Sequence, residues 1–251
     1  MNVLIFGGTT ESRILSGILR DCGATVTVCV ATDYGREEQA QEEGIRILAG
    51  KLPKEKKVHL FAQMDLCIDA THPYAEHITS SVREACISSG TPYYRLLRER
   101  SQPEDAVLVP DAAAAAKYLS EKEGNILLTT GGKELSAFSI LLPRRLYVRI
   151  LPTCEALAEC EKMRIPHRNI IAMQGPFTQE LNQALLHQFS ICYLVTKDGG
   201  TAGGFPEKAA AAKACGAEVI LLQRPAERGL SMDEILSLCD RFQREAKLPN
   251  N

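Results

Sequence analysis

Short apolar runs alternate along the chain with segments in which apolar residues recur every three or four positions. The run from Asn2 to Phe6 is followed by a glycine pair, and the residues from Ile14 to Leu19 are then apolar at helical spacing. A continuous apolar run predicts a buried parallel strand, and the longer period predicts an amphipathic helix. Because this alternation continues along the chain, we expect an α/β protein with parallel sheets.

The pattern also places the individual elements. Strands are expected at residues 2–6, 25–30, 44–50, 65–70, 93–98, 107–109, 125–129, 147–150, 169–172, 191–195 and 218–222. Helices are expected after the glycine pair, at residues 76–89, 111–120, 153–163, 178–187 and 206–215, and after Ser231. The polar loop from Glu99 to Asp105 interrupts the rhythm. We therefore expect two Rossmann-like lobes, residues 1–100 and 106–251, with a cleft between them.

Composition narrows the class of protein. The 251 residues are 45% hydrophobic and 24% charged, with a formal net charge of −2. This is enough apolar material for a core, and the charge favours neither nucleic acid nor a membrane surface as a partner. No apolar run approaches the ~20 residues of a membrane span. The first strand follows Met1 directly and leaves no room for a signal peptide, so we expect a cytoplasmic protein.

Cysteine and histidine patterns do not indicate a metal centre. The nine cysteines include no Cys-x-x-Cys pair, and the five histidines include no His-Glu-x-x-His. We interpret the cysteines as small buried hydrophobes in a reducing compartment, and we expect no bound metal.

The first glycine turn, residues 7–13, suits an anionic ligand. It reads Gly-Gly-Thr-Thr-Glu-Ser-Arg between a strand and a helix, where backbone N–H groups and the positive helix end can hold a phosphate. Thr9 and Ser12 stand where a dinucleotide fingerprint has its second and third glycines, so a structural turn is the alternative. After the second strand, Asp33 would favour NAD and Arg36 would favour NADP, and both also suit a plain turn.

A second polar turn follows the fourth predicted strand. It contains Thr71, His72, Pro73 and Tyr74 at the carboxyl end of the strand, where open α/β sheets bind ligands. His72 can act there as a proton donor or a hydrogen-bond anchor. In the alternative interpretation, His72 caps the following helix and Tyr74 packs beneath it.

Three glycine-containing turns follow strands in the second half, at residues 130–133, 174–177 and 197–204. Carboxyl ends of parallel strands share one edge of a sheet, so these turns should lie on a common ligand-binding edge. Tight strand-to-helix connections are the alternative explanation of the glycines.

Taken in order, these motifs resemble the precorrin-6A reductase family of corrin (vitamin B12) biosynthesis, which includes the cobalt-precorrin-6A reductases of the anaerobic branch. The residues that carry the resemblance are Gly7–Arg13, Asp69–Ala75, Thr130–Lys133, Gln174–Phe177, Thr196–Gly199 and Gln223–Pro225. The resemblance implies a reductase that transfers a hydride from NADPH or NADH to one macrocycle double bond, converting (cobalt-)precorrin-6A to (cobalt-)precorrin-6B. It also implies a tetrapyrrole substrate, with other corrin-pathway enzymes as partners.

The resemblance also implies roles for residues of this chain. The cofactor would lie in the N-terminal lobe on Gly7, Gly8, Thr9, Thr10, Glu11, Ser12, Arg13, Thr32, Thr71, His72 and Pro73. The substrate would lie in the C-terminal lobe on Thr130, Gly131, Gly132, Lys133, Gln174, Gly175, Pro176, Lys197, Asp198, Gly199 and Arg224, with Lys208 as a further cation for its acid groups. The candidate proton donors are His72, Tyr74 and Lys197.

Two other functions remain open from the sequence. One is a methyltransferase or glycosyltransferase on the same scaffold, for which Asp33 would hold a nucleotide-like donor. The other is a non-catalytic module that senses a metabolite or nucleotide. Binding of a reduced nicotinamide would count against the first, and turnover would count against the second.

Overall fold

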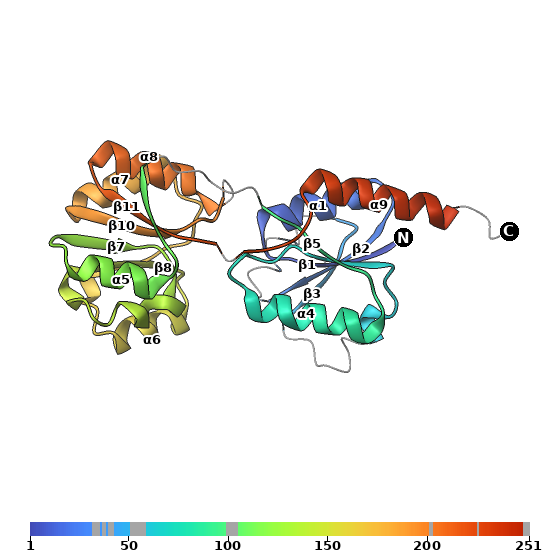
Figure 1. Ribbon diagram of the computed structural model, residues 1–251, viewed down its shortest axis with the longest axis horizontal. Helices are drawn as coiled ribbons and strands as arrows, with labels where there is room; N and C mark the ends of the chain where they lie inside the picture. Colours follow the sequence, from blue (N-terminus) through green and yellow to red (C-terminus); the bar gives the residue numbers. More distant parts are fainter. Residues whose placement is uncertain are drawn as a thin grey trace. The chain divides into compact units, whose positions relative to one another are not determined.

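A computed structural model of the chain describes residues 1–31, 36, 39, 43–50, 59–98, 105–200, 203–224 and 226–247. Thr32, Asp33 and most of the loop predicted to divide the lobes lie outside the described residues. The chain forms two compact units (Figure 1): Met1–Glu99 together with Pro225–Asn251, and Arg100–Arg224.

The N-terminal unit contains a five-stranded, all-parallel sheet in the order β3-β2-β1-β4-β5. Its strands are β1 (Asn2–Phe6), β2 (Thr25–Val30), β3 (Arg46–Ala49), β4 (Leu66–Asp69) and β5 (Tyr93–Arg95). Its helices include α1 (Thr10–Asp21), α4 (Glu76–Ser89) and α9 (Met232–Lys247). From β1 the chain adds β2 and β3 on one side and then β4 and β5 on the other, so the direction of winding reverses between β1 and β4. This is the strand order of a Rossmann unit.

Alternate residues of β1 face opposite layers, because successive side chains of a strand point to opposite faces. Val3 and Ile5 pack in a core with residues of α1 and α9. Leu4 and Phe6 pack in a second core with Phe61 and residues of α4. The sheet is therefore covered on both faces, as a buried parallel sheet requires.

The C-terminal segment belongs to the N-terminal unit, and the predicted boundary of the second lobe at residue 251 is wrong. Leu230 forms an isolated parallel bridge with Leu96, and its N–H donates to the carbonyl of Arg95 at 2.8 Å. Ile235 and Cys239 are buried in the core that also holds β1. They belong to α9, which Figure 1 shows beside α1 in this unit. The apolar stripe of α9 was visible in the sequence, but its period does not show which sheet it covers.

Shortening Ile235 tests this packing. Ile235→Val should lower the free energy of unfolding by about 1 kcal/mol, because one buried methyl group is lost. Ile87→Val, on the exposed side of α4, is the control and should change it by less than about 0.5 kcal/mol. Urea unfolding measures both. Equal effects would show that α9 does not share the core.

The C-terminal unit contains a six-stranded, all-parallel sheet in the order β6-β11-β10-β7-β8-β9. Its strands are β6 (Ala106–Val109), β7 (Asn125–Leu128), β8 (Leu146–Ile150), β9 (Ile170–Ala172), β10 (Ile191–Lys197) and β11 (Glu218–Leu222). Its α-helices are α5 (Ala112–Ser120), α6 (Cys154–Lys162), α7 (Gln179–Gln188) and α8 (Phe205–Cys215). Here the winding reverses between β7 and β10.

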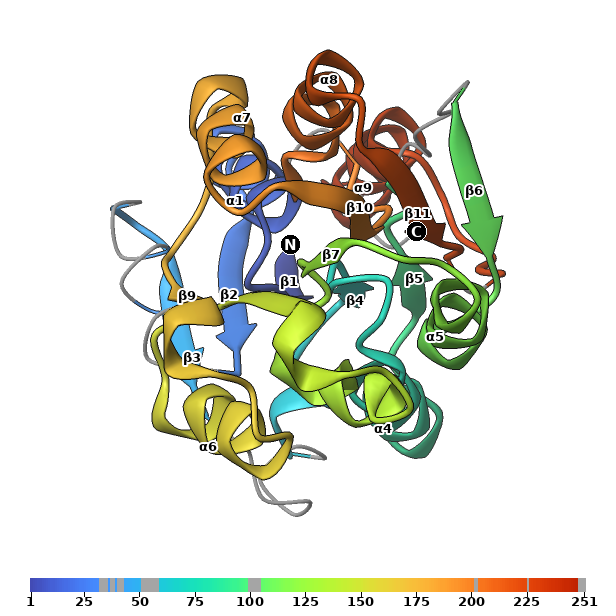
Figure 2. The ribbon, with the colours of Figure 1, turned by 90° about the vertical axis from the view of Figure 1, so that its left-hand side faces the viewer.

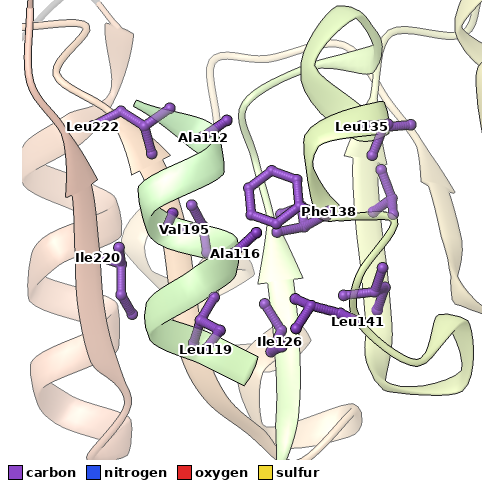
Figure 3. Close-up of a cluster of buried hydrophobic side chains, with 14 of the residues drawn as sticks. Ala112, Ala116, Leu119, Ile126, Leu135, Phe138, Leu141, Val195, Ile220 and Leu222 are labelled. Carbon is purple, nitrogen blue, oxygen red and sulfur yellow. The ribbon is translucent and has the colours of Figure 1, made fainter. Parts of the chain in front are cut away.

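Helices cover both faces of this second sheet. Figure 2 shows α7 and α8 on one face and α5 and α6 on the other. On the α5 face, Leu119, Ile126, Phe138 and Val195 are fully buried in one cluster (Figure 3). Leu127 and Leu194, one residue away along their strands, pack instead against the α7 and α8 layer. The alternation along each strand thus builds two cores from one sheet.

The segment after β7 differs from the sequence expectation. It resembles the first glycine turn in sequence, but it continues as the short 3₁₀-helices Gly132–Phe138 and Pro143–Arg145 rather than as an α-helix. Leu135 and Phe138 are three residues apart, so a 3₁₀ turn places them on the same side, and both are fully buried. Strand β10 is also longer than expected, since it includes Thr196 and Lys197.

The predicted Ncap residues agree with the structure. Asp111 and Thr178 cap α5 and α7 by accepting hydrogen bonds from backbone N–H groups, as Ncap residues do. All nine cysteines are free, and five of them are buried. Within the described residues, no group of three or more acidic, histidine or cysteine side chains could hold a metal ion, and no helix is long and apolar enough to span a membrane.

Candidate active site

The first candidate site lies where the winding of the N-terminal sheet reverses. Open α/β sheets bind ligands at such a point, outside the carboxyl ends of the two neighbouring strands. The turn after β1 and the turn after β4 both lie there. The Thr9 hydroxyl connects them by donating to the carbonyl of Ala70 at 3.0 Å. The two predicted cofactor turns are therefore brought together.

Ser12 and Thr9 organise the first turn from within. The Ser12 hydroxyl accepts from the N–H groups of Gly8 and Thr9, at 3.2 and 3.1 Å, and donates to the carbonyl of Thr9. The Thr9 hydroxyl accepts from the Ser12 N–H at 3.1 Å and closes a capping box at the start of α1. Because Ser12 is fully buried, its side chain shapes the turn and is not exposed to a ligand.

Glycine is favoured at the two positions of this turn, Gly7 and Gly8, for different structural reasons. A Cβ on Gly7 would lie 2.6 Å from the Ser12 Oγ and 3.2 Å from Val28, so only glycine fits under the turn. Gly8 has φ of +99° and is exposed, and a Cβ there would meet no atom within 4 Å. Gly8 thus presents bare backbone to open space beside the N-terminus of a 12-residue helix. This arrangement fits the pyrophosphate of a dinucleotide.

The polar residues that begin α1 differ in their surroundings. Glu11 forms an ion pair with Arg98, with Nη2 and Oε2 2.8 Å apart. Thr10 is exposed, and Arg13 is half-buried in the first turn of α1. Glu11 therefore anchors the chain after β5, whereas Thr10 and Arg13 remain at the surface of the turn.

Asp69, at the end of β4, holds the second turn together. Its Oδ1 accepts from the Thr71 N–H and hydroxyl, at 3.0 and 2.7 Å, and from Arg95 Nη1 at 2.7 Å. Its Oδ2 accepts from the Tyr93 hydroxyl at 3.0 Å. Arg95 also pairs with Glu227 at 2.7 Å. Burial and the Asp69 carboxylate raise the pKa of the Tyr93 phenol, which keeps it a donor.

His72 and Tyr74 lie at the surface of this turn. Both are half-buried, while Thr71 and Pro73 are buried. The Tyr74 N–H donates to His72 Nδ1 at 3.4 Å, and the two rings lie 5.5 Å apart. With Nδ1 as the acceptor, Nε2 carries the proton of a neutral imidazole. Ala75, and not His72, is the Ncap residue of α4.

The second candidate site lies where the winding of the C-terminal sheet reverses, between β7 and β10. Lys197 at the end of β10 forms an ion pair with Glu134 of the turn after β7. Asp198 forms a buried ion pair with Arg224, and its Oδ1 also accepts from the Gly200 N–H. The predicted substrate cations Lys197 and Arg224 are therefore each paired with a carboxylate of this chain.

The other predicted substrate residues lie on the same edge of this sheet. Thr130 is buried, and its hydroxyl has no hydrogen-bond partner among the described residues. Gly131 has φ of +87°, and Lys133 is exposed. Gln174 and Pro176 are also exposed, and Gly199 is buried. An unsatisfied buried hydroxyl beside glycine turns is a feature of a ligand-binding edge.

Three functional candidates were missed in the sequence: Asp69, Arg95 and Arg149. Asp69 and Arg149 lie in strands whose other residues are largely buried, whereas Arg95 is the buried residue of β5 beside two half-buried tyrosines. The available signal was a charged residue near the carboxyl end of a predicted buried strand, since such charges are rare without a partner.

The two reversed parallel sheets, with glycine-containing loops at each reversal, define an α/β protein of the Rossmann type. Residues 2–240 match the family described as precorrin-6x reductase CbiJ/CobK. The chain is 34% identical over 231 residues to the cobalt-precorrin-6A reductase of Priestia megaterium, covering 89% of this chain and 90% of that protein. It is 33% identical over 232 residues to that of Methanothermobacter thermautotrophicus, covering 90% and 77%.

A solved structure of a CobK precorrin-6A reductase has the same fold. It matches with a TM-score of 0.73 at 24% identity, over 96% of this chain and 97% of the other. The chain belongs to the precorrin-6x reductase family, and by family it is a precorrin-6A reductase, an oxidoreductase of corrin biosynthesis. The resemblance inferred from the sequence motifs is thereby confirmed, and the reductase is favoured over the transferase and the binding module.

Proposed function

We propose that the chain reduces one carbon–carbon double bond of precorrin-6A or its cobalt form, giving a precorrin-6B-type product, with NADPH or NADH as the hydride source. The observation that carries this proposal is the exposed Gly8 backbone at the reversal point of a Rossmann sheet, in a chain of the reductase family. When bound, the reduced nicotinamide supplies a hydride, and the chain supplies the positioning of both reactants.

The first two turns would hold the cofactor. Backbone groups of Gly8 and the start of α1 would bind the pyrophosphate, with Arg13 as a nearby cation. Gly7, Thr9 and Ser12 would keep the turn in shape through the hydrogen bonds described above. Thr71, His72 and Pro73 would border the nicotinamide.

Reduction of the double bond also requires a proton on the neighbouring carbon. His72 and Tyr74 are candidate donors on the N-terminal unit, because both side chains lie at the surface of the turn that would border the nicotinamide. Lys197 is a candidate on the C-terminal unit. In this structure its ammonium is held by Glu134, which fixes its position at the end of β10.

Lys197 and Glu134 provide a test of the substrate edge. Lys197→Met should raise the KM for the macrocycle about three- to fivefold, because a partly exposed cation for its acid groups is lost. Glu134→Gln should lower the KM, because a competing carboxylate is removed. Steady-state kinetics at saturating cofactor measure both. A change of KM in the same direction in both variants would remove this ion pair from the substrate edge.

The proposed function is tested by titration and turnover. The purified protein should bind NADPH or NADH, followed through the fluorescence of the reduced nicotinamide. With the bound cofactor it should convert precorrin-6A or cobalt-precorrin-6A, and one reduced nicotinamide should be oxidised for each macrocycle reduced. Binding of neither nucleotide, with or without the macrocycle, would contradict the proposal.

A further inference from the structure

The return segment, residues 226–230, follows the C-terminal unit in the chain and lies against the end of β5. The Leu230 N–H donates to the carbonyl of Arg95, and the Leu97 N–H donates to the carbonyl of Leu230, both at 2.8 Å. A Cβ on Gly229 would clash with the Arg95 carbonyl oxygen and lie 3.0 Å from Leu97 Cγ, so glycine is required for this close approach. Backbone contacts therefore fix the return segment beside β5.

Glu227 of the return segment holds one side of the Arg95 guanidinium. Its Oε1 accepts from Arg95 Nε at 3.2 Å and from Arg95 Nη2 at 2.7 Å. The Arg95 side chain is 3% exposed, and the Glu227 side chain is 19% exposed. Two charge-assisted hydrogen bonds to a planar group define its orientation as well as its position. Glu227 thus sets the plane of the guanidinium.

The other side of the same guanidinium holds the turn that would border the nicotinamide. Arg95 Nη1 donates to Asp69 Oδ1 at 2.7 Å and to the Thr71 hydroxyl at 3.0 Å. The Thr71 N–H also donates to Asp69 Oδ1, and His72 follows Thr71 at the surface of the turn. Because the guanidinium is a rigid plane, the position of Glu227 is linked to that of the backbone that carries His72.

Neutralisation of Arg95 does not require Glu227. Arg95 is already paired with the fully buried Asp69, with 2.7 Å between Nη1 and Oδ1. The return segment is already held by the backbone hydrogen bonds of Leu230. With Glu227 the group has two carboxylates for one guanidinium, and an extra charge in a buried place is unfavourable for folding. The second carboxylate therefore indicates a positional role.

The return segment begins close in sequence to the predicted substrate edge. Arg224, three positions before Glu227, donates from Nε to the Asp198 carbonyl at 2.8 Å and from Nη2 to Asp198 Oδ1 at 3.0 Å. Asp198 directly follows β10 in the C-terminal unit. An arginine–carboxylate contact thus lies at each end of the short stretch from Arg224 to Glu227, one contact in each unit. The chain that holds the cofactor turn is therefore attached at its other end to the substrate edge.

We propose that Glu227 is a positioning residue for the reduction, which acts through Arg95 to hold the Thr71–His72 turn where it borders the nicotinamide. The inference rests on the proposed function, because that function places the nicotinamide at this turn. A displaced turn leaves the pyrophosphate on the first turn but moves the nicotinamide and His72 out of alignment. Hydride transfer depends steeply on such alignment.

The test compares Glu227→Gln with Asp21→Asn. Glu227→Gln keeps the shape of the side chain and removes its charge, so its hydrogen bonds to Arg95 become weaker. Asp21→Asn is the matched control, because Asp21 also pairs with an arginine of this unit, Arg20 at 2.9 Å, at the opposite end of α1 from the cofactor turns. Both carboxylates are partly exposed, so both variants should fold, and urea unfolding checks this.

Glu227→Gln should oxidise the reduced nicotinamide about tenfold more slowly in single-turnover reactions at saturating macrocycle and nucleotide. Its dissociation constant for the nucleotide should change less than about twofold, because the first turn holds the pyrophosphate. The KM for the macrocycle should also be unchanged. Asp21→Asn should match the original chain in all three quantities. An unchanged single-turnover rate in Glu227→Gln, or an equal loss of rate in Asp21→Asn, would overturn the proposal.

The outcome is separable from that of the proposed function, because the turn can be observed without cofactor. The NMR signals of the Thr71 amide and the His72 ring should shift in Glu227→Gln and not in Asp21→Asn. If the protein oxidises neither NADPH nor NADH but these signals shift, Glu227 still holds the turn and the reductase proposal fails. If turnover is normal and both the rate and the signals are unchanged in Glu227→Gln, the reductase proposal stands and the role of Glu227 does not.

Discussion

Asp69→Asn should lower the free energy of unfolding by about 3–5 kcal/mol, because it leaves a buried guanidinium without one of its two carboxylates. Asp69 is fully buried, and its two oxygens accept hydrogen bonds from Thr71, Tyr93 and Arg95. The asparagine amide presents N–H donors where one carboxylate oxygen accepts, so at least one donor of this set must lose its partner. Urea unfolding of the purified variant measures the effect.

Asp240→Asn is the matched control in the same unit. Asp240 pairs with Arg244 one turn along α9, and both side chains are more than half exposed. Its loss should change the free energy of unfolding by about 0.3–0.5 kcal/mol. A loss below about 1 kcal/mol for Asp69→Asn would show that Arg95 is satisfied by Glu227 alone.

Gly8→Ala should weaken binding of the reduced nicotinamide roughly 10- to 100-fold. The new methyl group would project into the open space before the turn, where the pyrophosphate is proposed to lie. Loss of one hydrogen bond to a charged group alone is worth roughly 1.5–3 kcal/mol. Calorimetric or fluorescence titration with NADPH and NADH measures the dissociation constant directly.

Gly23→Ala separates binding from backbone strain. Gly23 follows the same helix α1 at its other end, has φ of +83°, and would also place its Cβ in open space. Both variants should lose about 1–2 kcal/mol of stability, because alanine is strained at a positive φ. Only Gly8→Ala should lose affinity for the cofactor. Equal affinities in the two variants would remove the first turn from the cofactor site.

Local patterns were sufficient to predict most elements of this fold. The apolar run at residues 25–30 became β2 with those bounds, and the predicted helix at residues 76–89 became α4. Thr178, predicted as a cap, accepts the expected backbone hydrogen bond. These features depend on residues close together in the chain, so a single sequence contains their signal.

Features that depend on distant residues could not be predicted in this way. The period of α9 marks an apolar stripe, but the choice between two sheets depends on contacts with Leu96 and the core around β1. The charges of Asp69 and Arg95 were placed in the right strands. Their pairing, however, requires that β4 and β5 be neighbours with these residues in register. Likewise, Arg95 and Glu227 are 132 positions apart in sequence and meet only because the chain returns to the N-terminal unit.

The C-terminal unit is an insertion within the N-terminal one, and this has a consequence for synthesis on the ribosome. The ribosome must add Arg100–Arg224 before it reaches the segment that completes the first unit. At about 5–20 residues per second, this interval is on the order of ten seconds. During this time the sheet face around Val3 and Ile5 lacks Ile235 and Cys239, which later cover it. Until its last helix emerges, the nascent chain therefore exposes the part of this apolar face that α1 does not cover, and that part is open to chaperones or to aggregation.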